Sequence, residues 1–166
     1  MSKIHRLAGV SLATALACGV ATSANAQLLQ HKDLSSAIAT TIALTAVDTC
    51  KEQGYNVSVH VVGRNGEVLV GLRHHAAGVN TFENSWKKAY TSRTFRIASG
   101  KFADNVGQNP VAGQLFLANI VAARGALPIM IGEETIGAVG VSGAPGGDKD
   151  EVCAQAGIDK VKDQLR

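Results

Sequence analysis

The feature that most constrains the fold is the dipeptide Asn65-Gly66, which stands between two short runs of β-branched and other apolar residues. Residues 57–62 and 67–72 place apolar side chains at alternating positions, as half-buried strands do. Asparagine and glycine tolerate the positive φ angles of a two-residue hairpin turn. We therefore predict that the two runs pair as an antiparallel β-hairpin.

Helices are expected on both sides of this hairpin. Apolar side chains recur every fourth residue from 34 to 50, which predicts an amphipathic helix that Gly54 can end in the left-handed conformation. A second helix is expected from about residue 80, and helical spacing predicts that its apolar side is buried. That side comprises Phe82, Trp86, Tyr90 or Ala89, Arg93 and Ile97.

A second hairpin and a last helix complete the pattern. Residues 126–131 and 135–141 are apolar runs that we expect to pair over a turn at 132–134. The last helix is expected to begin at Asp148 and to carry an apolar stripe of Val152, Ala156 and Val161. The order helix, hairpin, helix, hairpin, helix predicts an α+β fold with an antiparallel sheet.

The residue identities in the last third of the chain are more informative than their pattern of strand, turn and helix. A strand over 136–141 leads into a glycine-rich corner at 143–147 and then into carboxylates, which suit a first helical turn because its free N–H groups favour negative charge. The carboxylates are Asp148, Asp150 and Glu151. The motif Ser-Gly-Ala-Pro precedes these carboxylates, and Cys-Ala-Gln-Ala-Gly follows them. With both motifs, this segment resembles the C-terminal segment of the GlcG/HbpS family, the haem-degrading domain proteins.

The resemblance extends from about Leu34 to the C-terminus. Residues 57–70 resemble the first hairpin of the family, 87–91 its central helix and 113–117 the segment before the next strand. It implies a profilin-like α/β/α sandwich with a five-stranded antiparallel sheet, haem as cofactor and assembly into homo-oligomers. Some haem-binding members use a threonine where this chain has Val111, so their mode of iron coordination is not expected here.

The first residues are typical of a secretory signal peptide. Basic residues precede an apolar run over 7–17 that is too short to span a bilayer, and Ala24-Asn25-Ala26 offers small residues for cleavage. We predict a signal peptide over 1–26, a single domain over 27–166 and a periplasmic or secreted location. Loss of Lys3 and Arg6 lowers Lys+Arg from 16 to 14 against 13 Asp+Glu, and a net charge of about +1 argues against a nucleic-acid partner.

Export also changes the expected chemical state of the cysteines. Cleavage leaves Cys50 and Cys153, an even number in an oxidising compartment. The two can form a disulfide if the first and last helices pack on the same face of the sheet. The alternative is a pair of buried free thiols, which behave as small hydrophobic side chains.

The histidines offer the best candidate ligands. Arg73-His74-His75 lies where the second strand ends and the loop into the aromatic helix begins, and neutral imidazole is a good iron or zinc ligand. Because the pair departs from the common family pattern, we predict His74 and His75 as this chain's own metal ligands. The alternative is two solvent-exposed loop residues. His60, within a strand, is interpreted as a satisfied core or interface residue.

The helix that follows these histidines offers further contacts to a haem. Aromatic rings can flank the macrocycle, and basic side chains can pair with its propionates. The candidates for cofactor binding, besides the histidines, are Arg73, Trp86, Lys87, Tyr90 and Arg93, with Lys88 as a further basic group. The alternatives are aromatic rings buried in the core and basic groups paired with carboxylates of a neighbouring subunit.

These residues predict an exported protein that binds haem or another tetrapyrrole non-covalently and acts as a scavenger, a carrier or the accessory of a membrane sensor. The sequence has no Cys-x-x-Cys-His motif for covalent haem and no His-Glu-x-x-His or phosphate-binding loop, so a non-enzymatic role is favoured. The alternative function is a small-molecule-binding or catalytic accessory protein of a catabolic pathway, of the glycolate or diol type, in which members of the family also occur.

Overall fold

Two antiparallel hairpins form one four-stranded sheet in the computed structural model, which describes residues 28–109 and 113–166. β1 (Ser58–Val62) pairs with β2 (Val68–Arg73), and β3 (Ala126–Ile131) pairs with β4 (Glu134–Ser142). β1 and β4 are also antiparallel neighbours, which gives the order β2-β1-β4-β3. Both predicted hairpins are confirmed, and Gly66 adopts φ +80° in the first turn.

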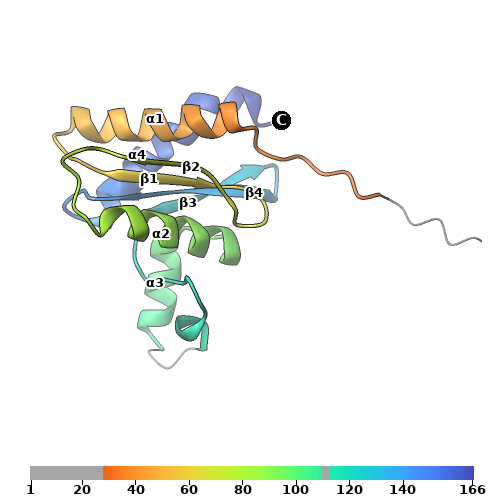
Figure 1. The fold of residues 1–166 in the computed structure, drawn as a ribbon. Helices are drawn as coiled ribbons and strands as arrows, with labels where there is room; N and C mark the ends of the chain where they lie inside the picture. Colours follow the sequence, from red (N-terminus) through yellow and green to blue (C-terminus); the bar gives the residue numbers. More distant parts are fainter. Residues whose placement is uncertain (1–27, 110–112) are drawn as a thin grey trace, which may run out of the picture. The chain divides into compact units, whose positions relative to one another are not determined.

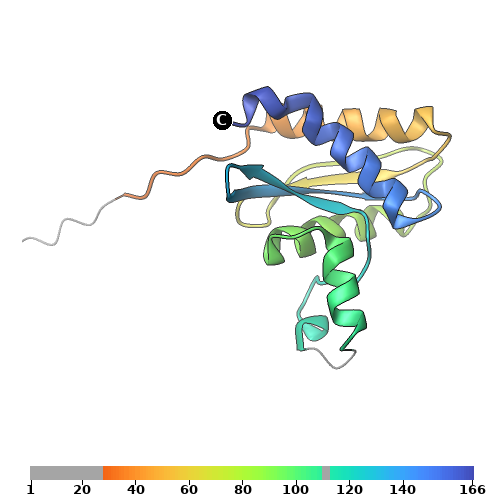
Figure 2. The ribbon, with the colours of Figure 1, turned by 180° about the vertical axis from the view of Figure 1, so that it is seen from behind.

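Helices cover both faces of this sheet. α1 (Ser36–Glu52) and α4 (Gly147–Val161) lie together on one face, and α2 (Thr81–Phe95) lies on the other (Figure 1 and Figure 2). α3 (Ser99–Gly107) leads away from the sheet, and short 3-10 helices follow at Gly113–Phe116 and Lys162–Gln164. No helix in the described part of the chain is long and apolar enough to cross a membrane.

The sheet differs from the five strands that the resemblance implies, because the described residues form four. The segment that enters β3 from Leu117 forms no strand of its own, although its last residue, Gly125, accepts the N–H of Val141 in β4 at 2.8 Å. The N–H of Ile120 donates to the carbonyl of Leu117, and the N–H of Val121 donates to Thr91 Oγ1 at 3.0 Å. This segment is therefore attached to α2, to itself and, at its end, to β4. The predicted signal peptide and Val111 lie outside the described residues.

The apolar core lies between the sheet and the pair α1 and α4. Inward-facing valines of β1 and β4 meet Ile42 and its neighbours on α1, all fully buried. Gly157 lets α4 approach α1 closely, because a Cβ atom there would lie 2.6 Å from the carbonyl oxygen of Ile42. Val161 of the predicted stripe is buried, but Val152 is 54% exposed and points away from this core. Burial of each large side chain contributes roughly 1.5–3 kcal/mol.

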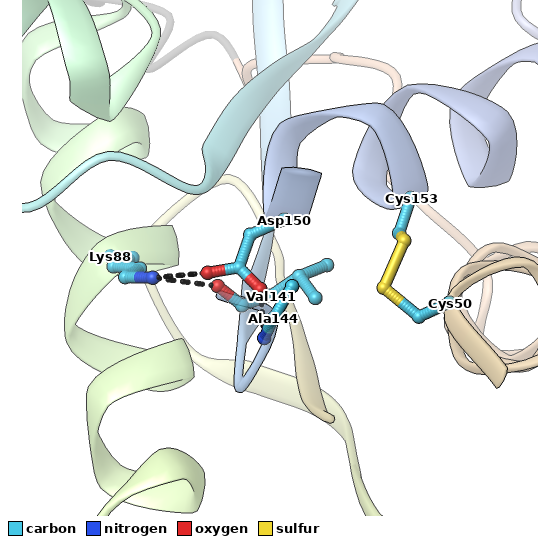
Figure 3. Close-up of a disulfide and its surroundings, with 6 residues drawn as sticks. All are labelled: Cys50, Lys88, Val141, Ala144, Asp150 and Cys153. Atoms are coloured by element: carbon cyan, nitrogen blue, oxygen red, sulfur yellow. Dashed lines mark hydrogen bonds and ion pairs between the residues drawn. A yellow bond between two sulfur atoms is a disulfide. The ribbon is translucent and has the colours of Figure 1, made fainter. Parts of the chain in front are cut away.

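A disulfide joins the two helices of this face. Cys50, near the end of α1, is bonded to Cys153 of α4, with Cα atoms 5.5 Å apart (Figure 3). Both cysteines are fully buried within the apolar core. Of the two states that the sequence left open, the structure has the bridged one.

The opposite face carries α2, whose buried side differs from the prediction. The side chains that α2 buries are small or polar, namely Thr81, Ser85, Lys88, Ala89, Thr91 and Ser92. The helix lies so close to β4 that a Cβ atom on Gly140 would be 2.2 Å from the carbonyl oxygen of Ser85. Large rings cannot fit into so narrow a gap. Phe82 is therefore 40% exposed, and Trp86 is only partly buried.

Candidate functional site

The predicted histidine pair lies at one corner of the sheet, where β2 ends. The backbone N–H of His74 donates to the carbonyl of Val57, which continues the pairing between β1 and β2 by one residue. The rings of His74 and His75 lie 4.2 Å apart between centroids, and His75 is exposed. His74 Nδ1 accepts the N–H of Ala76 at 3.3 Å, which leaves its Nε2 as the nitrogen free to bind. The side chains at this corner, which we call the histidine corner, are Arg73, His74 and His75.

The electrostatics of the histidine corner favour a neutral imidazole. Partial desolvation lowers the pKa of His74, and the nearby charges of His75 and Lys51 lower it further. A neutral imidazole has a free lone pair and is the form that binds a metal. The guanidinium of Arg73 donates to the carbonyl of Ala77 at 2.5 Å, which ties the loop after β2 and leaves other N–H groups of Arg73 available.

Partly buried aromatic and basic side chains flank the buried side of α2, and Trp86 packs against Val62, Ala89 and Ala138. The rings of Trp86 and Tyr90 lie 6.2 Å apart, and Trp86 Nε1 is buried without a hydrogen-bond partner among the described residues. Lys87 pairs with Glu83 at 2.6 Å. Lys87 and Glu83 line a hollow of about 320 Å³, together with Asn80, Asn84 and Val121.

The structure divides the predicted site residues into two groups. The histidine corner precedes α2, whereas Tyr90 and Arg93 lie near its other end, beside the β1–β2 turn. The helix rises about 1.5 Å per residue, so Thr81 and Arg93 are about 18 Å apart along its axis. Trp86 and Lys87 lie between the two groups. Nothing in the described structure brings Arg93 to the histidines.

Lys88 has a partner that the sequence did not predict. Its Nζ atom lies 2.8 Å from Asp150 Oδ2 and donates to the carbonyl of Val141 at 3.0 Å (Figure 3). Asp150 Oδ1 accepts the N–H of Ala144, so the network joins α2, the end of β4 and the start of α4. Lys88 is 3% exposed and Asp150 is 2% exposed, which removes Lys88 from contact with a ligand or a neighbouring subunit.

The ionisation of Asp150 reflects two opposed effects. Burial raises its pKa, and the Lys88 charge and the Ala144 N–H both oppose this rise because they stabilise the carboxylate. An acidic first turn could be seen in the sequence. The pairing of Lys88 with Asp150 could not be seen, because the two residues are 62 positions apart in the sequence.

His60 fits its interpretation as a satisfied core residue. It is 4% exposed, its Nδ1 lies 2.8 Å from Ser85 Oγ and its ring packs on Phe82 at 4.3 Å. Burial lowers its pKa to about 4, so the ring is neutral at neutral pH. Gly71 on β2 makes room for it, because a Cβ atom there would lie 2.7 Å from His60 Nε2.

Comparison with known proteins places this arrangement among relatives. The model of the family described as haem-degrading, HbpS-like proteins matches residues 34–159. A 15.0 kDa protein of Citrobacter freundii, uncharacterised and encoded in the dhaT–dhaS intergenic region, is 33% identical over 102 residues. The matched part covers 60% of this chain and 71% of that relative.

Solved structures share the fold. The crystal structure of HbpS has a TM-score of 0.77 at 32% identity, covering 81% of this chain and 94% of HbpS. The crystal structure of PduOC, solved as a complex with haem, has a TM-score of 0.69 at 24% identity. That match covers 76% of this chain and 93% of PduOC, and it is a likeness of fold alone.

Proposed function

Because this chain belongs to the HbpS-like haem-degrading protein family, we propose that it binds haem non-covalently at the histidine corner. The observation that carries the proposal is the adjacent pair His74 and His75 at an open edge of the sheet, with the pKa of His74 lowered toward the neutral form. The relative PduOC, which shares the fold, was crystallised with haem.

The donor set at this corner fits a haem. The macrocycle supplies four nitrogen ligands to its iron, so one or two imidazoles from the protein complete the coordination. Within residues 28–109 and 113–166, no group of three or more histidine, cysteine or acidic side chains could hold a bare metal ion. His75 is exposed and His74 offers Nε2, so either can serve as the axial ligand.

Neighbouring groups support the orientation of the macrocycle. Arg73 precedes the histidines and can donate charge-assisted hydrogen bonds to a propionate. The exposed part of Phe82, near the start of α2, offers an apolar surface, and Trp86 and Lys87 follow along the same helix. Tyr90 and Arg93, also predicted as haem contacts, are left out of this proposal because a propionate on a haem ligated at the corner does not reach them on the same chain.

The proposed setting is the periplasm or the outside of the cell, where the protein acts as a haem scavenger, a carrier or the accessory of a membrane sensor. The disulfide supports this location, because such bonds persist in oxidising compartments. The basic, apolar and small-residue segments of 1–26 support export. The half-exposed aromatic rings of α2 support assembly into a homo-oligomer.

A second candidate function is the binding of a small molecule in a catabolic pathway. The observation that favours it is the size of the hollows, which range from about 130 to about 350 Å³ among those along α2 and the turns beside it. Sites for small ligands begin at about 300 Å³, and a tetrapyrrole would not be enclosed in any of these hollows. This candidate predicts no effect of His74 or His75 on binding.

A haemin titration followed by absorbance tests the proposal. We expect a saturable shift of the Soret band at one haem per chain, and a clear change of the band in H74A or H75A, whichever residue ligates the iron. H31A is the matched control, because His31 is an exposed histidine in a different part of the chain. A flat response in the wild-type protein, or an unchanged band in both single variants and their combination, would contradict the proposed site.

A further inference from the structure

Three arginines from separate segments gather at the end of the sheet opposite the histidine corner. Arg64 lies in the β1–β2 turn, Arg93 in the last turns of α2 and Arg96 at the C-cap of that helix. All three line one hollow of about 350 Å³, closed on its other side by Glu133, Glu134 and Thr135 of the β3–β4 hairpin. We call this hollow the arginine hollow.

Arg64 forms a fixed wall of the arginine hollow. Its Nε donates to Asp33 Oδ1 at 2.9 Å and its Nη1 donates to Glu134 Oε1 at 2.6 Å. Its remaining nitrogen donates to the carbonyl of Lys32. Every nitrogen of this guanidinium is therefore engaged, and its single charge is paired with two carboxylates. Arg64 holds the hollow in shape and has little left to offer a ligand.

Arg93 is the donor left without a partner. Its side chain is half-buried and forms no ion pair with a described acidic residue, and its Nε–H is buried with no acceptor. Desolvation lowers the pKa of Arg93, and the charges of Arg96 and Arg64 lower it further, against a smaller opposite effect of Glu67 and Glu134. An anion would give the buried N–H an acceptor and would offset the repulsion between Arg93 and Arg96.

A second hollow joins Arg93 to the hairpin turn. It measures about 130 Å³ and is lined by Tyr90, Thr94 and the turn residues 64–66 as well as by Arg93. The ring of Tyr90 lies over Gly66, where a Cβ atom would be 2.8 Å from Tyr90 Cε2. Arg93 thus lines both this smaller hollow, together with Tyr90, and the larger arginine hollow.

From these contacts we infer that the arginine hollow binds a small organic carboxylate, with the fork of Arg93 as its main donor and Arg96 as a second positive charge. A carboxylate matches the planar, two-pronged geometry of a guanidinium. The two carboxylates among the lining side chains, Glu133 and Glu134, repel a doubly charged phosphate more strongly than a singly charged carboxylate. Arg93 and Arg96 line the hollow together with the exposed Glu133, while Arg64 is already paired with Asp33 and Glu134. This inference is independent of haem binding, because the hollow lies at the other end of α2.

The test is an NMR titration of the ¹⁵N-labelled protein, in which the arginine Nε–Hε signals are followed as sodium acetate and then sodium succinate replace sodium chloride at constant ionic strength. We expect a saturable downfield shift of the Arg93 signal with at least one of the two carboxylates. R93Q should bind at least tenfold more weakly, as read from the backbone amides of the β1–β2 turn. R166Q is the control, because Arg166 is an exposed arginine at the chain end.

A second variant keeps the inference falsifiable if R93Q disturbs the fold. R93K retains the charge and loses the planar fork, so it should bind the carboxylate several-fold more weakly while its spectrum stays that of the folded protein. Equal binding in R93K, R93Q and the wild-type protein would overturn the inference, as would the absence of a saturable shift with either carboxylate. Haemin titration of R93Q should match the wild type. Loss of haem in R93Q would assign the hollow to the haem site and overturn a separate carboxylate site.

Discussion

On the face of the sheet covered by α1 and α4, the buried side chains are almost all apolar, whereas the face covered by α2 buries hydroxyl groups, a histidine and a lysine–aspartate pair. On the first face, a disulfide joins the two helices. On the second face, side-chain hydrogen bonds join β1 to α2, such as Ser58 with Thr81 and His60 with Ser85, each at 2.8 Å.

This difference determines where each face can carry a ligand. Apolar burial on the α1 and α4 face stabilises the fold and leaves few polar groups that could bind a ligand. On the other face, glycine in β4 lets α2 lie close to the sheet, so small and polar groups fill the gap and the large rings are only partly buried. The two clusters with unused binding groups, the histidine corner and the arginine hollow, lie near the two ends of α2.

Removal of the disulfide should have the largest effect on stability. The bond closes a loop with a sequence separation of 103 residues, for which chain entropy predicts a loss of about 4–5 kcal/mol in C50S/C153S. Urea unfolding of the oxidised wild type and the double variant measures this loss. A change below about 1 kcal/mol would show that the α1 and α4 face holds without the bond.

Breaking the buried ion pair should have the next largest effect. K88M leaves the Asp150 carboxylate buried and unpaired, which costs about 3–5 kcal/mol. K87M is the matched control, because the exposed pair of Lys87 with Glu83 contributes less than about 1 kcal/mol. Urea unfolding at pH 7 compares the two variants. Equal losses would mean that Lys88 is not buried as the structure has it.

The buried His60 should make the α2 face sensitive to acid. Its pKa is about 4 in the folded protein against an ordinary value of 6.5, so the unfolded chain binds the proton more readily between these values. The stability that the neutral ring supports is complete above pH 6.5 and is lost as the pH falls toward 4, by at most about 3 kcal/mol.

The variant H60Q isolates this contribution of His60. Glutamine can still reach Ser85 but does not titrate, so the fall in unfolding free energy between pH 6.5 and pH 4 should be smaller in H60Q than in the wild type. The comparison cancels other titrating groups, including Asp150. Parallel pH profiles for the two proteins would contradict the assignment of His60.

Widening the gap beneath α2 should have the smallest of these effects. In G140A the new methyl group meets the helix backbone at Ser85, so overpacking should cost about 1–3 kcal/mol. G107A, on α3, is the control, since nothing lies within 4 Å of its added Cβ atom and the change should be neutral or stabilising by up to about 1 kcal/mol. Thermal unfolding of both variants gives the comparison, and an unchanged G140A would argue against the close approach of α2.

Local signals in the sequence predicted the elements well. Asn65-Gly66 and Gly132 marked both hairpins, and the four-residue spacing before Gly54 marked α1. The orientation of α2 could not be predicted, because the aromatic spacing favoured burial and only Gly140 on a distant strand reverses that preference. For the same reason the pairing of Lys88 with Asp150 depends on packing rather than on any local pattern.

The candidate site was predicted in part. The position of Arg73, His74 and His75 at the end of a strand follows from the hairpin pattern. The separation of these three residues from Tyr90 and Arg93 does not follow from the sequence pattern, because it depends on the direction in which α2 crosses the sheet. The arginine hollow was visible only as an excess of basic residues, since it takes the two hairpin turns to bring Arg64 and Glu134 to the end of that helix.

The most direct test of the account is a paired measurement on H74A/H75A, in which haemin binding and the free energy of unfolding are determined on the same sample. The account predicts that the unfolding free energy stays within about 0.5 kcal/mol of the wild type, because both side chains lie outside the core, while the Soret band of bound haem is lost. A Soret band of wild-type position and affinity in this variant would contradict haem binding at the histidine corner.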